Sequence, residues 1–139
     1  MKKILFIAML IIASTQGYAQ SLTVINNIVG SALQFKVRGQ NLPAACNTSL
    51  SALIPLAGST SWFFGTPTTP PLVMVPPVVL PFAYDAVYFE VLSGGVVICS
   101  GNVGKQACGW VPTVPIPCIP GVHTAAWTNV GPNVTVTFN

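Results

Sequence analysis

Side chains that could transfer a proton are scarce in this sequence. The chain has two carboxylates, Asp85 and Glu90, and one histidine, His123. Asp85 and Glu90 are five residues apart in a segment with strand periodicity, and an odd separation places two side chains on opposite faces of a strand. They are therefore not expected to flank one glycosidic bond as the carboxylates of a glycosidase do. The serines lack a Gly-x-Ser-x-Gly elbow, so we expect neither catalysis nor a cofactor.

The cysteines are the second group with reactive chemistry. Cys46, Cys99, Cys108 and Cys118 are an even number in a chain that begins like an exported protein, which predicts two disulfides. Four cysteines allow three connectivities. We favour Cys99–Cys108, closing the turn-rich loop SGNVGKQA, with Cys46–Cys118 joining distant parts of the chain. A zinc site is the competing interpretation, but the chain has no Cys-x-x-Cys pair and only one histidine, so no metal is expected.

Several aromatic side chains are candidates for a ligand-binding surface: Trp62, Tyr84, Tyr88 and Trp110. Exposed tryptophan and tyrosine rings offer an apolar body with a polar edge, which suits stacking on sugars. In the competing interpretation, Trp62 and Trp127 fill the core and Trp110 packs on a disulfide.

The segment 66–82, TPTTPPLVMVPPVVLPF, combines prolines with an unbroken apolar run. Proline lacks an N–H group, so this stretch is excluded from the centre of a sheet, although residues 72–75 could form a short edge strand. We expect an ordered crossover between the two halves of the fold, with five aliphatic side chains at least partly buried: Val73, Val75, Val78, Val79 and Leu80. They would pack on their own domain or on a neighbouring subunit, which makes Val78 and Val79 candidate partner contacts.

Alternating apolar residues predict strands elsewhere in the chain. Leu33, Phe35 and Val37 form the clearest half-buried strand. The segment YDAVYFEVL is followed by the turn signal Ser93-Gly94-Gly95 and then VVICS, which predicts a hairpin. The opening LTV and the closing TVTF are expected to pair with each other or to lie at sheet edges. About seven to eight short strands with Gly, Pro and Asn turns predict an all-β domain, a single antiparallel β-sandwich with long Pro-rich loops and two disulfides.

The first twenty residues, MKKILFIAMLIIASTQGYAQ, have the layout of a secretory signal peptide. Two lysines precede the apolar run 4–13, and Gly17-Tyr18-Ala19 precedes the expected cleavage site. The short, lysine-led form is typical of bacteria. No later stretch reaches the roughly 20 apolar residues of a membrane helix. We therefore expect residues 21–139 to form one secreted domain, extracellular, at the cell surface or in the periplasm, with no transmembrane segment.

Residues 21–139 carry only five charged side chains. Lys36, Arg38 and Lys105 stand against Asp85 and Glu90, for a net charge of +1. An average domain is about 25% charged, and a net charge near zero favours association. No basic patch exists for binding nucleic acid.

These features predict an exported, non-enzymatic structural or adhesive protein of the cell surface or extracellular matrix. Low charge, disulfides and apolar proline loops suit self-association. The alternative is a small carbohydrate- or ligand-binding β-sandwich module that uses its exposed aromatic rings, with a surface glycan as partner.

Overall fold

The chain folds into strands throughout its described part. The structure, a computed structural model, describes residues 21–42, 46, 48–78 and 81–139. The expected signal peptide, residues 1–20, lies outside them. Within the described residues there are eleven strands and one 3-10 turn, η1 (Gln106–Cys108), with no α-helix. The protein is therefore all-β, as its periodicity predicts.

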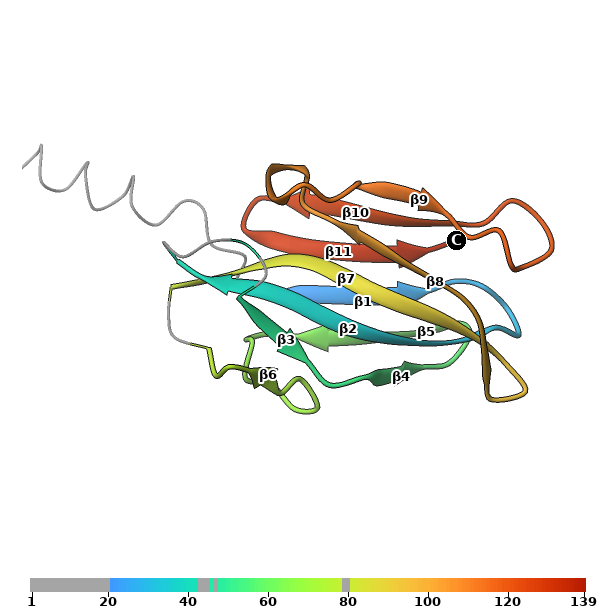
Figure 1. Ribbon diagram of the computed structural model, residues 1–139, viewed down its shortest axis with the longest axis horizontal. Coiled ribbons are helices and arrows are strands. Elements are labelled where there is room, and N and C mark those ends of the chain that lie inside the picture. Colours follow the sequence, from blue (N-terminus) through green and yellow to red (C-terminus); the bar gives the residue numbers. More distant parts are fainter. Residues whose placement is uncertain (1–20, 43–45, 47, 79–80) are drawn as a thin grey trace, which may run out of the picture.

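The strands form two sheets (Figure 1). The first, sheet A, has the order β5-β1-β11-β10-β9, with bounds β1 (Leu22–Asn26), β5 (Thr60–Phe64), β9 (Thr113–Pro115), β10 (Thr124–Val130) and β11 (Asn133–Phe138). The second, sheet B, has the order β6-β3-β2-β7-β8, and β4 also pairs with β2. Its strands are β2 (Ala32–Asn41), β3 (Ser49–Ser51), β4 (Ile54–Leu56), β6 (Met74–Val75), β7 (Phe82–Ser93) and β8 (Val96–Gly104).

The structure differs from the expected architecture in two details. The strand count exceeds seven to eight because β3, β4, β6 and β9 are short pieces of two or three residues. The pairing is also not purely antiparallel. The first and last strands, β1 and β11, lie side by side in parallel, with Val24 opposite Val136. Parallel neighbours require a long connection between them, and the whole intervening chain supplies it. The expected pairing of LTV with TVTF is thus confirmed.

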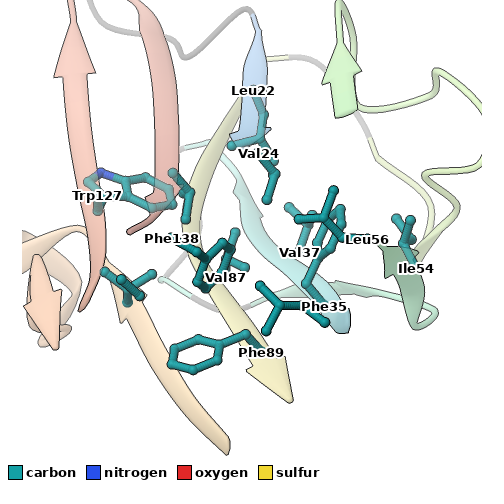
Figure 2. Close-up of a cluster of buried hydrophobic side chains, with 14 of the residues drawn as sticks. Leu22, Val24, Phe35, Val37, Ile54, Leu56, Val87, Phe89, Trp127 and Phe138 are labelled. Atoms are coloured by element: carbon teal, nitrogen blue, oxygen red, sulfur yellow. The ribbon is translucent and has the colours of Figure 1, made fainter. Parts of the chain in front are cut away.

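The inner faces of the two sheets share one apolar core. Leu33, Phe35 and Val37 of β2 are buried, as their alternation predicts. Figure 2 shows side chains of both sheets pointing toward one another, with Trp127 and Phe138 from sheet A approaching Val87 and Phe89 from sheet B. The rings of Phe89 and Phe138 meet edge to face, with centroids 5.1 Å apart. This core makes the fold sandwich-like.

The predicted hairpin is present as β7 and β8. Only Gly94 and Gly95 separate Ser93 from Val96, and their φ angles are +58° and +82°. Two positive φ angles in a two-residue loop are the signature of a type I′ turn, whose twist matches that of the strands. Glycine is the residue that adopts both without strain.

The proline-rich segment contributes β6 at the edge of sheet B. Met74 and Val75 pair with β3, so a short edge strand within residues 72–75 is confirmed. The expected burial of Val73 and Val75 is wrong, because their exposed fractions are 63% and 67%. Strand alternation instead turns Leu72 and Met74 into the core. Val78 is half-buried and packs against that core. Val79 and Leu80 lie outside the described residues.

Two disulfides are present, but the favoured connectivity is wrong. The bonds are Cys46–Cys108 and Cys99–Cys118, with Cα atoms 5.7 Å and 5.9 Å apart. The segment SGNVGKQA, expected to be a loop, is largely strand, because β8 continues to Gly104. At roughly 3.3 Å per residue, this strand carries Cys99 and Cys108 beyond the 4.4–6.8 Å or so that a disulfide spans.

Candidate binding surface on sheet B

The outer surface of β2, β7 and β8 is lined mostly by polar and charged side chains; we call it the polar face. Its residues alternate with buried ones such as Phe35 and Phe89, so they point away from the core. The strand register arranges them in three rows: Gln34, Glu90 and Ser100; Lys36, Tyr88 and Asn102; Arg38, Ala86 and Gly104. The face therefore carries three of the five charged side chains of residues 21–139.

Glu90 is held by two neighbours on this face. The Tyr88 hydroxyl donates a hydrogen bond to Oε1 of Glu90 over 2.7 Å, and Nε2 of Gln34 donates one to Oε2. The bond from Tyr88, followed by that from Gln34, lowers the pKa of Glu90 below its ordinary value. The same bond to Glu90 raises the pKa of Tyr88. At neutral pH the pair is thus an ionised carboxylate and a protonated phenol, which orients the tyrosine ring on the sheet.

Arg38 and Trp110 form a second contact at the other end of the face. The guanidinium carbon of Arg38 lies 5.6 Å from the centroid of the indole ring, within the range of a cation–π interaction. Trp110 reaches this position because its segment folds back along the end of β8. The N–H of Gly104 donates to the carbonyl of Val111 over 3.1 Å, and the N–H of Trp110 donates to that of Lys105 over 3.3 Å.

Three polar atoms in this area have no hydrogen-bond partner among the described residues. They are Nε of Arg38, Nε1 of Trp110 and Oδ1 of Asn102, and each is shielded by protein. Arg38 shares a register row with Gly104, and Asn102 stands two residues before Gly104 on the same face. Buried polar groups are nearly always hydrogen-bonded, and these three neighbouring atoms are exceptions to that rule.

The structure distributes the aromatic candidates among different places. Tyr88 and Trp110 belong to the polar face. Trp62 does not, because it lies on the inner side of β5, stacks on Phe64 and donates from Nε1 to the carbonyl of Pro55 over 2.9 Å. Trp127 is buried in the core, as one interpretation of the sequence proposed.

Tyr84 was expected on the same surface as Tyr88, and this is wrong. Its side chain is 1% exposed. The ladder between β2 and β7 shifts between Arg38 and Gly39, so Arg38 pairs with Ala86 whereas Gly39 pairs with Tyr84. The additional residue, Asp85, breaks the alternation and turns Tyr84 into the core. Arg38 and Asn102 were not among the candidates, although the alternation of Gln34, Lys36 and Arg38 already indicated a polar strand face.

Asp85 lies near the Cys46–Cys108 disulfide. Oδ1 of Asp85 is 3.4 Å from Sγ of Cys108, and ligand atoms of Cys46, Asp85 and Cys108 lie within 4.8 Å of one another. The two sulfur atoms are bonded to each other, so neither is a thiolate, the form that binds metals. In this oxidised state the cluster is structural.

No protein-family model, curated protein or solved structure matches this chain. Among the described residues, no helix has the length and apolar character needed to cross a membrane.

Proposed function

We propose that this chain is an exported, non-enzymatic adhesive protein that attaches to carbohydrate outside the cell through its polar face. The observation that carries this proposal is the middle row of the polar face, where the hydrogen-bonded ring of Tyr88 lies between Lys36 and Asn102. A sugar hydroxyl both donates and accepts hydrogen bonds, so it could pair with the ammonium of Lys36 and with the amide of Asn102. The leader-like sequence 1–20 and the two disulfides support export.

The composition of the face also favours a sugar over other ligands. The aromatic rings of Tyr88 and Trp110 can contact the apolar side of a pyranose, while the planar groups of Gln34, Arg38 and Asn102 suit directional hydrogen bonds. An extended strand surface accommodates a linear chain of sugars.

A binding role fits the placement of the carboxylates. Glu90 is fixed by hydrogen bonds from Tyr88 and Gln34, and Asp85 has no exposed surface. Two carboxylates on either side of a bound sugar, as hydrolysis requires, would need a different arrangement.

The test is binding of oxidised residues 21–139 to an array of glycans, followed by variants. Tyr88→Ala removes the ring expected to contact the sugar, and a lost contact of about 1 kcal/mol predicts roughly fivefold weaker binding. Asn102→Ala should have a similar effect. Thr135→Ala, on the outer side of sheet A, is the matched control and should bind like the unaltered protein. Failure to bind any glycan, or binding that Tyr88→Ala and Asn102→Ala both leave unchanged, would refute the proposal.

A second candidate function, self-association, is favoured by the edge strand β8. Val96, Val97 and Ile98 are 66%, 46% and 46% exposed on this edge of sheet B. No residue of β8 is charged, whereas natural edge strands commonly carry charges that prevent pairing with another chain. Two copies could pair their β8 strands antiparallel about a twofold axis.

Light scattering coupled to size-exclusion chromatography tests this second function. The oxidised protein should dimerise with rising concentration, and Val97→Lys should keep it monomeric. Val130→Lys is the control, because Val130 is also exposed, at 67%, but lies beside the β10–β11 turn of sheet A, away from β8. A protein that stays monomeric at high concentration would exclude self-association without affecting the glycan proposal.

A further inference from the structure

A small pocket lies at one end of the molecule, apart from the polar face. Its volume is about 170 Å³, and its polar lining comes from Tyr84, Lys105 and Asn129. Ala83, Gly131, Pro132 and Val134 form the rest of the wall. The beginning of β7, the end of β8 and the β10–β11 turn meet at this end, on the left of Figure 1. The pocket is therefore built jointly by sheets A and B.

Local backbone geometry turns the polar residues toward this pocket. The irregularity at Asp85 directs Tyr84 inward rather than onto the polar face. Lys105 directly follows Gly104, which belongs to a row of the polar face, so strand alternation points the lysine to the opposite side. Asn129 continues the inward series of β10 that contains Trp127.

All three side chains offer hydrogen-bond donors. The hydroxyl of Tyr84 is buried and has no partner among the described residues. Burial raises the pKa of Tyr84 well above its usual range, so the group remains a phenol that can donate. Nε1 of Trp127 donates to Oδ1 of Asn129 over 3.2 Å. Because an indole N–H only donates, this bond fixes the amide orientation and leaves its NH₂ group as a donor.

The charge of the pocket has one sign. Lys105 brings an ammonium group, and none of the described lining residues is acidic. A cation and two neutral donors around a small space complement an anion with more than one acceptor oxygen. A water-sized group occupies about 30 Å³, so the pocket has room for roughly five or six heavy atoms. A carboxylate attached to a short carbon chain has this size.

We propose that this pocket binds the carboxylate of a small ligand or chain end, with Lys105 supplying the charge and Tyr84 and Asn129 the directional hydrogen bonds. Pro132 and Val134 would contact the carbon atoms next to the carboxylate. The inference goes beyond the glycan proposal and does not depend on it, because the residues of the two sites are different.

The experiment is a titration of oxidised, ¹⁵N-labelled residues 21–139 with sodium acetate, followed by NMR at constant ionic strength. The reporters are the amide of Gly131, the side-chain NH₂ of Asn129 and the indole N–H of Trp127. Acetate should produce saturable shifts at these reporters, whereas acetamide, its neutral analogue, should produce none. Shifts that do not saturate, or equal shifts with acetamide, would overturn the proposal.

Variants assign the binding to named groups. Lys105→Gln should weaken acetate binding at least about tenfold, and Tyr84→Phe, which keeps the ring in place, by about threefold to tenfold. Lys36→Gln removes a cation of the polar face and should leave acetate binding unchanged. Unaltered binding in Lys105→Gln would refute the assigned site, and the spectrum of each variant in the absence of acetate verifies its fold.

Further titrations distinguish the sources of a carboxylate. Galacturonate represents an acidic sugar, and diglycine with a free or amidated C-terminus represents a chain end. Tighter binding of either carboxylate than of acetate, with loss in Lys105→Gln, supports the proposal and identifies the source. Inorganic phosphate that binds more tightly than every carboxylate would overturn the assignment in favour of a tetrahedral anion.

Discussion

The outer surfaces of the two sheets are built by the same strand alternation but with different chemistry. On sheet A the register brings together uncharged side chains, chiefly threonines: Thr23, Phe63, Thr128 and Thr135 in one row, and Ile25, Ser61, Thr113, Ala126 and Thr137 in the next. On sheet B the polar face carries Lys36, Arg38 and Glu90. In a chain with so few charges, this asymmetry distinguishes the uncharged outer surface of sheet A from the polar face, to which we assign the proposed recognition.

The threonines allow the outer surface of sheet A to be stable and hydrated without charged side chains. Its β-branched side chain favours extended backbone, and its hydroxyl remains compatible with water. On sheet B, Lys36 and Arg38 have long flexible side chains that contribute less to strand formation. Their presence in the central strand β2 is better explained by contacts such as that of Arg38 with Trp110 than by stability of the sheet.

The strongest test of this comparison contrasts the two sides of one strand. Phe89 is buried against Phe138 of the other sheet, so Phe89→Ala should destabilise the protein by about 3–5 kcal/mol. Its neighbour Tyr88 points outward, and Tyr88→Ala should change stability by less than about 1 kcal/mol. Urea unfolding of the oxidised proteins measures both. Equal losses would mean that the polar face is part of the stabilising core rather than a recognition surface.

The second prediction concerns the covalent link between the two regions. Cys99 lies on β8 of sheet B, and Cys118 lies in the segment between β9 and β10 of sheet A. Their separation of 19 residues predicts that replacing both cysteines by alanine costs about 3 kcal/mol. Hydrogen exchange should accelerate first in β8 and β9, where the sheets are joined, while β1 and β11 remain protected. Uniform acceleration in all strands would show that the link acts on the whole fold instead.

The third prediction asks whether Arg38 is specifically coupled to Trp110. A double-mutant cycle of Arg38→Met and Trp110→Leu should give a coupling free energy of about 0.5–1 kcal/mol, as expected for a cation–π contact near the surface. A second double-mutant cycle, of Lys36→Met and Trp110→Leu, provides the control. Its coupling free energy should be near zero. Similar coupling in both cycles would indicate a general effect of positive charge.

Much of this contrast follows from local sequence. The alternation of Leu33, Phe35 and Val37 predicts β2 and its two faces, because each position depends only on its neighbours along the strand. The turn at Gly94 and Gly95 is equally local. These features required no knowledge of the tertiary structure.

Long-range relations were not predictable in the same way. The register shift at Asp85 reverses the orientation of Tyr84, and no residue type in this segment predicts the shift. The disulfide partners depend on the length of β8, which the turn-like composition of SGNVGKQA conceals. The meeting of Arg38, Asn102 and Trp110 joins three separate segments, so it exists only once β2, β7 and β8 are paired and the segment after η1 has folded back.

The smallest predicted effect is a pH dependence confined to the polar face. Hydrogen bonds from Tyr88 and Gln34 lower the pKa of Glu90 in the folded protein, so the ionised form is favoured by folding. The resulting stabilisation is present above the ordinary glutamate pKa and is lost as the pH falls through the lowered value. Carboxyl NMR shifts should show the pKa of Glu90 rising in Tyr88→Phe, which removes the hydroxyl donor and keeps the ring. Thr128→Val, a similar loss of a hydroxyl on sheet A, should leave it unchanged. A pKa of Glu90 equal in all three proteins would mean that the Tyr88–Glu90 contact does not orient the polar face, and the difference between the two sheet surfaces would then rest on Arg38 and Trp110 alone.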